Sequence, residues 1–236
     1  MRHIVSATFG LCLAVAGSAE AQSTTSQPVV VVELYTSQGC SSCPAADDYL
    51  ATLTRDPQVI PLALHVDYWD YIGWADTFSD PKFTLRQKAY AHAIGSRTIY
   101  TPQMIVGGLD RVEGNRPAEV QALIRRHLDG AHDVALEVTR TGDRLAIAAS
   151  SRTPLEAPLR VQLVRFREEA TVEIERGENA GRTITYHNIV TSWQPLGDWS
   201  GEAPLAIEAK APGGDPAVVI LQSAGPAAIV AAARID

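Results

Sequence analysis

The stretch VVVVELYTSQGCSSCPAAD, residues 29–47, decides the predicted fold of this chain. Its first eight residues, 29–36, form a β-branched run of the kind that makes a central parallel strand, buried on both faces. The next three residues predict a turn. A helix is expected to follow, with Pro44 in its first turn, where a missing N–H costs nothing. Cys40 and Cys43 therefore stand between a buried strand and the start of a helix.

The placement of this Cys-x-x-Cys pair indicates redox chemistry. Free N–H groups and the helix dipole at a helix start favour a thiolate, so Cys40 is predicted to be the accessible nucleophile. Cys43 lies one turn further along the chain, and we expect it to be buried. Attack by Cys40 on a substrate disulfide would give a mixed disulfide, which Cys43 is expected to resolve. Glu33 lies inside the apolar strand, where burial would raise its pKa, and it is predicted to take the proton from Cys43. The dithiol carries two electrons itself, so no cofactor is expected.

A proline at a strand start gives a second indication. Thr101-Pro102 directly precedes a predicted strand over residues 103–106. Proline cannot donate a hydrogen bond to a sheet, so at this position it marks a special turn. In the cis form it would place the backbone of Thr101 beside the dithiol, ready to pair with an extended substrate. Thr101 and Pro102 are therefore predicted to bind substrate.

An aromatic-rich segment, residues 65–74, leaves the second predicted strand. Strand ends in open parallel sheets face the ligand crevice, so this segment is expected to form one wall of a groove beside Cys40. Tyr68 and Trp69 are its predicted substrate contacts. A small aromatic core under a loop is the alternative that the sequence leaves open.

The chain is predicted to divide near residue 131. Strands alternate with helices before that residue, which indicates an α/β domain over residues 28–130. Runs with a period of two follow, punctuated by Gly, Pro, Asp and Asn, and predict an all-β, sandwich-like domain over residues 131–236. Residues 22–27 are polar, and no regular structure is expected there. The expected elements of the first domain are strands over 29–36, 59–66 and 103–106, and helices over 41–55, 80–94 and 117–128.

The start of the chain reads as a secretory signal peptide. Residues 1–21 combine a basic start, an apolar run over residues 4–16 and the cleavage signal Ala19-Glu20-Ala21. A periplasmic or secreted protein is therefore expected, with no transmembrane segment in the mature chain. The net charge of −7 argues against nucleic acid as a partner, because phosphate binding needs a basic face.

Four stretches together resemble a secreted bacterial family catalogued as domain of unknown function number 1223: ELYTSQGCSSCPAAD, LHVDYWDYIGW, YTPQMIVGG and GENAGRTITYHNIV. The strand, the cysteine pair and the Thr101-Pro102 strand are similar to the thioredoxin fold, although Ser-Ser stands between the cysteines where thioredoxin has Gly-Pro. The resemblance implies a thioredoxin-like domain and no particular reaction.

The leading functional hypothesis is an extracytoplasmic thiol–disulfide oxidoreductase that acts on envelope proteins, with an unidentified redox partner. The alternative is a non-catalytic envelope protein that binds copper or a protein, with a structural Cys40–Cys43 disulfide. Soft thiolates suit copper, and His65 or His92 are the candidate additional ligands. Half of a zinc site is a weaker alternative, because a closed structural site needs four ligands and the chain has no second cysteine pair. The leading hypothesis therefore assigns no metal ligands, and copper belongs only to the alternative.

Overall fold

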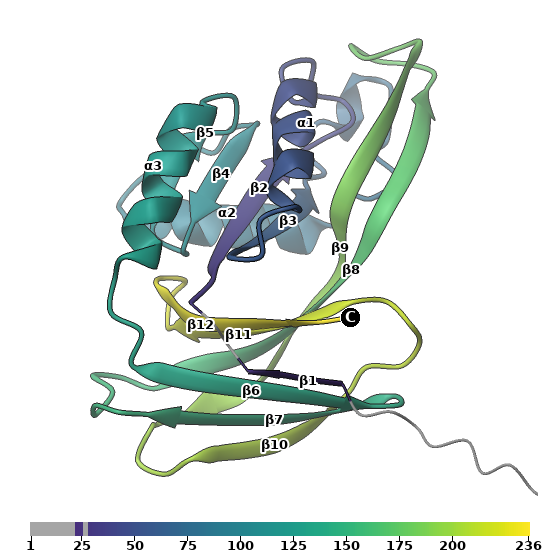
Figure 1. Cartoon of the computed structure of the whole chain (residues 1–236). Helices are drawn as coiled ribbons and strands as arrows, with labels where there is room; N and C mark the ends of the chain where they lie inside the picture. The colour runs from purple at the N-terminus through teal and green to yellow at the C-terminus, as the bar shows by residue number, and fades with distance from the viewer. Residues whose placement is uncertain (1–21, 26–27) are drawn as a thin grey trace, which may run out of the picture.

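A computed structural model describes residues 22–25 and 28–236 (Figure 1). The chain is mixed α/β, with a large sheet in the order β12-β11-β8-β9-β3-β2-β4-β5 and a small sheet in the order β1-β6-β7-β10. This confirms the coarser part of the predicted fold class. The predicted signal peptide, residues 1–21, lies outside the described residues.

The first half of the chain forms around strand β2, Val30–Thr36, as its β-branched run predicts. Strand β2 pairs in parallel with β3 and antiparallel with β4, and every one of its residues is buried. The other elements of this half are β3 (Val59–His65), β4 (Gln103–Val106), β5 (Asp110–Glu113), α1 (Pro44–Leu53), α2 (Pro81–Ala93), α3 (Pro117–Leu128) and the 3-10 turn η1 (Asp70–Ile72).

The two faces of this half-sheet pack against different helices. Alternate β2 residues such as Val32 and Leu34 pack with Leu50 of α1 and with α3. The residues between them, such as Tyr35, pack with Phe83 and Tyr90 of α2. In Figure 1, α1 and α3 accordingly lie in front of the sheet and α2 lies behind it. A side chain of β2 therefore faces either α1 or α2, but not both.

The second half is entirely β-structure and extends the same large sheet. Strand β9 lies beside β3 in parallel through the pair Ala63 and Ile189. The predicted domain boundary near residue 131 thus separates two stretches of chain whose strands share one sheet. The strands of this half are β6 (Val134–Thr141), β7 (Arg144–Ser151), β8 (Leu159–Ile174), β9 (Arg182–Trp199), β10 (Leu205–Lys210), β11 (Ala217–Ser223) and β12 (Ile229–Ile235).

Strands β8 and β9 form the longest hairpin. Figure 1 shows them running from the region of the small sheet up past β3 to the level of α1. Strand β8 runs without interruption over Leu159–Ile174 and β9 over Arg182–Trp199. The turn between β8 and β9 is thereby carried far from the rest of the second half.

The small sheet packs against the β8, β11 and β12 part of the large sheet and encloses an apolar core. The expectation of no regular structure in residues 22–27 is wrong for Gln22–Thr25, which forms β1. Strand β1 pairs antiparallel with β6, so the open edge of β6 provides backbone partners that a polar sequence alone does not reveal. In the described residues, no helix is both long and apolar enough to cross a membrane.

Candidate functional site

Cys40 and Cys43 form a disulfide between the end of β2 and the start of α1, with their Cα atoms 5.4 Å apart. Cys43 is the N-cap residue of α1 and Pro44 begins the helix. The Cys43 N–H donates to the Cys40 carbonyl at 3.2 Å, and this hydrogen bond closes a tight turn of the backbone from Cys40 to Cys43. The strand, the cysteine pair and the helix therefore follow one another as the sequence predicts.

The disulfide is buried. Cys40 is 1% exposed and Cys43 is 0% exposed. The burial of Cys43 is confirmed, but the prediction that Cys40 is accessible is wrong for the disulfide form. The connection between β3 and α2, residues 66–80, is called the aromatic loop here, and it packs against the residue before Cys40: a Cβ added at Gly39 would lie 3.2 Å from the Cβ of Trp69. Another sulfur can reach this buried disulfide only if the residues around it move locally.

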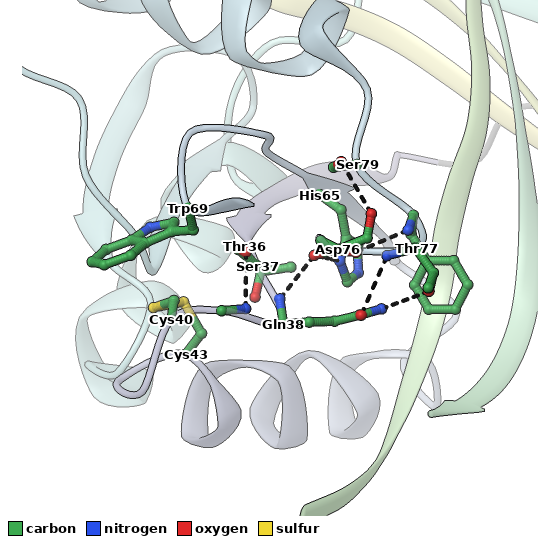
Figure 2. Close-up of polar contacts among 12 residues, drawn as sticks. Thr36, Ser37, Gln38, Cys40, Cys43, His65, Trp69, Asp76, Thr77 and Ser79 are labelled. Carbon is green, nitrogen blue, oxygen red and sulfur yellow. Dashed lines mark hydrogen bonds and ion pairs between the residues drawn. A yellow bond between two sulfur atoms is a disulfide. The ribbon is translucent and has the colours of Figure 1, made fainter. Parts of the chain in front are cut away.

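The aromatic loop is tied to the residue that precedes Gly39 (Figure 2). The backbone N–H of Gln38 donates to Asp76 Oδ2 at 2.8 Å, and its side-chain oxygen accepts from Trp74 Nε1 at 2.8 Å. Asp76 also accepts from the backbone N–H of Phe78. These hydrogen bonds hold the aromatic loop against Gln38, two residues before Cys40.

The four predicted substrate-binding residues lie together. Trp69 Nε1 donates to Thr101 Oγ1 at 2.8 Å, and the Tyr68 hydroxyl donates to Gln87 Oε1 at 3.2 Å. Gln87 in turn donates to the carbonyl of Tyr100. The Thr101–Pro102 peptide bond is cis, as the sequence predicts. Burial raises the pKa of Tyr68 to about 12, so its hydroxyl stays a neutral donor at physiological pH.

Glu33 is not brought to the dithiol. Its carboxylate accepts from Arg86 Nε at 2.7 Å and Nη2 at 2.9 Å, from the Tyr90 hydroxyl at 2.6 Å and from the Tyr35 hydroxyl at 3.0 Å. All of these partners belong to the side of the sheet that α2 covers, whereas Cys43 begins α1 on the opposite side. The geometry thus gives no support to a proton transfer between Glu33 and Cys43.

Asp47 is the acid on the same side as the cysteines. It lies four residues after Cys43 on α1, so its side chain covers the turn that Cys43 begins. Asp47 is buried, its Oδ2 accepts from Thr36 Oγ1 at 3.0 Å, and its Oδ1 has no hydrogen-bond partner. Burial raises the pKa of Asp47 to about 7, against the opposing effects of His65 and Thr36. The sequence alone does not single out Asp47, because an acid in the first turn of a helix is ordinary.

A second buried pair lies next to Asp47. His65 Nδ1 is 2.7 Å from Asp76 Oδ2, both side chains are fully buried, and His65 Nε2 has no partner. The His65 ring packs edge-on against Tyr186 of β9. Burial, with the charges of Asp47 and Asp76, raises the pKa of Tyr186. The interior behind the disulfide therefore holds four neighbouring ionisable residues, Asp47, His65, Asp76 and Tyr186.

We expect Asp47 to make the stability of the protein depend on pH. The unfolded chain releases this proton near pH 4, whereas the folded protein retains it up to about pH 7. Since the folded state binds more protons between these values, the free energy of unfolding falls as pH rises from about 4 to 7, by at most about 4 kcal/mol. Asp47→Asn should remove this decline, and urea unfolding at several pH values measures it.

Asp48→Asn is the matched control, because Asp48 is the exposed neighbour of Asp47 on the same helix. The control should keep the decline seen in the unmodified protein. A decline that persists unchanged in Asp47→Asn would show that another group causes it.

The turn between β8 and β9 reaches the cysteine loop. The Asn179 side chain is 1% exposed, and its Nδ2 donates to the carbonyls of Gln38 and Cys40, each at 2.9 Å. Glu178 Oε2 accepts from the backbone N–H of Ser41 at 3.3 Å. The sequence alone does not single out Glu178 or Asn179, because residues 178–182 have the composition of an ordinary polar turn. The one available signal was the stretch GENAGRTITYHNIV, which belongs to the family resemblance.

The two histidines considered as copper ligands lie in different surroundings. His65 is buried and bonded to Asp76, whereas His92 is exposed on α2. Within residues 22–25 and 28–236, no group of three or more His, Cys, Asp or Glu side chains is arranged to hold a metal ion.

Comparisons with known proteins support the sequence resemblance. The family described as "Protein of unknown function (DUF1223)" matches residues 31–222. The crystal structure of protein AGR_C_4864 from Agrobacterium tumefaciens is similar, with 33% identity, 89% of this chain and 95% of that chain covered, and a TM-score of 0.76. HBP35 of Porphyromonas gingivalis shares the fold at 13% identity, with coverage of 88% and 74% and a TM-score of 0.63. No curated protein is significantly similar to the chain.

Proposed function

The chain belongs to the family described as "Protein of unknown function (DUF1223)", and we propose that it is a thiol–disulfide oxidoreductase. The observation that carries this proposal is the Cys40–Cys43 disulfide at the start of α1, with the buried acid Asp47 one turn behind it. A helix start stabilises a thiolate, and an acid with a pKa of about 7 can both accept and return a proton at neutral pH.

We propose a thioredoxin-like domain over residues 28–130, followed by a sandwich-like domain over residues 131–236. The order β2, α1, β3, α2, β4, β5, α3 supports the first part, with the cysteine pair after β2 and Thr101-Pro102 before β4. The apolar core between the small sheet and β8, β11 and β12 supports the second.

In the reductive direction, the Cys40 thiolate attacks one sulfur of a substrate disulfide. The bond between Cys40 and that sulfur forms, the substrate S–S bond breaks, and the other substrate sulfur leaves as a thiolate. Cys43 then loses its proton to Asp47 and attacks Cys40. The Cys40–Cys43 bond forms as the second substrate sulfur leaves, so two electrons have passed to the substrate. The same steps in reverse oxidise a substrate dithiol.

The proton acceptor in this scheme is Asp47 rather than Glu33. The backbone N–H of Asp47 donates to the Cys43 carbonyl at 3.1 Å, and its free Oδ1 has no competing donor. Glu33 is held by four donors on the opposite side of the sheet. Its proposed role is therefore to anchor α2.

The substrate segment is proposed to lie along Thr101 and Pro102, against Trp69 and Tyr68. Trp69 links the cysteine pair to the proposed peptide-binding residues, since its Cβ lies against Gly39 and its indole N–H donates to Thr101. An extended peptide placed here has its backbone beside Thr101 and its sulfur near Cys40. Movement of Trp69 would open the path to the disulfide.

The proposed substrates are thiols or disulfides of envelope proteins, because residues 1–21 predict export to the periplasm or beyond. An unidentified redox partner renews the dithiol or the disulfide. A structural Cys40–Cys43 disulfide in a copper-binding or protein-binding envelope protein is the competing proposal.

Reduction of insulin by dithiothreitol tests the proposal. We expect catalytic amounts of the protein to accelerate the reduction severalfold, because Cys40 attacks the insulin disulfides and dithiothreitol regenerates the dithiol. Cys40→Ser should remove the acceleration, whereas Ser41→Ala, which retains both sulfurs, should keep most of it. If the unmodified protein adds nothing to the rate of dithiothreitol alone, the exchange function is wrong. A stoichiometric Cu(I) complex of the reduced protein would then favour the competing proposal.

A further inference from the structure

The turn between β8 and β9 is built into the surroundings of the disulfide. Its residues 175–181 belong to the second half of the chain, and the long hairpin carries them to the level of α1 (Figure 1). Gly177 also packs against the aromatic loop, since a Cβ there would lie 3.4 Å from the Cβ of Trp74. The turn thus contacts both residues 38–41, which carry Cys40, and the aromatic loop.

Asn179 fixes the position of this turn. Its Nδ2 holds the carbonyls of Gln38 and Cys40, which lie on either side of Gly39, and its Oδ1 accepts from Arg182 Nη1 at 3.0 Å. Both polar atoms of this buried side chain are therefore satisfied. Such a side chain is costly to displace, because its partners would lose their hydrogen bonds in a buried place.

Glu178 places a negative charge beside Ser41, three residues before the first residue of α1. Its Oε2 accepts from the Ser41 N–H, the first backbone donor after Cys40. This N–H directly follows Cys40 in the chain and would otherwise be available to stabilise a Cys40 thiolate. Glu178 therefore acts against the thiolate twice, by occupying a donor and by its own charge.

We propose that the β8–β9 turn sets the reduction potential of the dithiol, with Glu178 disfavouring the Cys40 thiolate and Asn179 holding Glu178 in place. Both are positioning residues. The inference deepens the proposed function by assigning its direction: a destabilised thiolate favours the disulfide, so the reduced protein is an electron donor to substrate disulfides.

Other charged groups also face this region. Arg182 of β9 is bonded to the Asn179 amide oxygen, and Asp47 on α1 is buried behind the cysteines. His65 of β3 and Asp76 of the aromatic loop form a pair deeper in the interior. Asp48 of α1, and Glu175 and Arg176 of the same turn, are exposed. Of the acids named here, only Glu178 accepts from a backbone N–H next to Cys40, so its replacement should have the largest effect on the thiolate.

Equilibrium with glutathione tests the proposal. In this reaction two molecules of glutathione reduce the Cys40–Cys43 disulfide and become one glutathione disulfide. Glu178→Gln should raise the ratio of dithiol to disulfide severalfold at a fixed glutathione ratio, and should shift thiolate formation at Cys40, followed by ultraviolet absorbance, to lower pH. Both effects should shrink at high salt, because the charge is exposed and is screened there.

Glu175→Gln is the matched control, since it removes the same charge from an exposed position in the same turn. It should leave the equilibrium nearly unchanged. In an Asn179→Ala background, Glu178→Gln should have little further effect, because the turn no longer holds the carboxylate in place. Circular dichroism checks that each variant is folded.

Equal shifts in Glu178→Gln and Glu175→Gln, or none in either, would overturn the inference. The measurement needs no protein substrate, so it is separate from the insulin test. If Glu178→Gln shifts the glutathione equilibrium but the protein does not accelerate insulin reduction, the role of the turn is supported and the oxidoreductase function is contradicted. If the protein accelerates insulin reduction but Glu178→Gln leaves the equilibrium unchanged, the function is supported and the role of the turn is contradicted.

Discussion

Replacing Cys43 with serine is expected to leave the protein covalently joined to its substrates. Cys40 can still attack a substrate disulfide in this variant, but the introduced hydroxyl cannot displace the bound sulfur, so the mixed disulfide persists. The unmodified protein should show almost no such adducts, because Cys43 is held one turn away and closes the disulfide. Non-reducing electrophoresis of envelope extracts, followed by mass spectrometry of bands that disappear on reduction, measures the adducts and identifies the substrates.

The reciprocal replacement supplies the control. Cys40→Ser should form few adducts, because this variant lacks the sulfur that is proposed to attack the substrate. The pair would be a structural disulfide if the Cys43→Ser protein accumulates no adducts and the Cys40→Ser protein is merely less stable.

Replacing Arg86 with leucine is expected to be among the most destabilising single changes in the protein. The Glu33 side chain is 0% exposed and that of Arg86 only 12% exposed. Loss of one partner leaves a buried charge uncompensated, which typically costs about 3–5 kcal/mol. Arg86 also stacks on Trp193 and donates to Gln222, so it ties α2 to the second half of the chain. Urea unfolding at neutral pH measures the loss.

Two variants sharpen this test. Arg116→Ala removes an ion pair with Glu113 in which both side chains are about half exposed, and should cost about 1 kcal/mol or less. Glu33→Leu combined with Arg86→Leu should recover part of the lost stability, because neither charge is then stranded. An Arg86→Leu protein as stable as the Arg116→Ala protein would contradict the structural role of the pair.

The elements that carry the cysteines could be predicted because their signals are local. The β-branched run produced β2, and Pro44 marked the start of α1. The predicted strand over residues 103–106 and helix over residues 117–128 agree with β4 and α3 at both ends. In each case hydrophobic spacing and a proline or glycine lie within a few residues of the feature they define.

The rest of the site depends on contacts that no local pattern contains. Asn179 contacts the carbonyl of Gln38 across 141 positions of sequence, which requires the unbroken length of β8 and β9. Asp47 resembles any acid in a first helical turn, and only its burial distinguishes it. The side chain of Glu33 was predictable as buried, but the face it occupies depends on the register of β2 against its neighbours.

The shared sheet limits how this chain can be divided or recombined. Strand β9 lies beside β3, and Asn188 adds a bond from its Nδ2 to the Pro61 carbonyl of that strand. A gene fusion that carried only residues 28–130 would turn β3 into an open edge with unpaired backbone groups, inviting association with other chains. Residues 28–130 are therefore not a portable module: they can be transplanted only together with the strands that close the edge of β3.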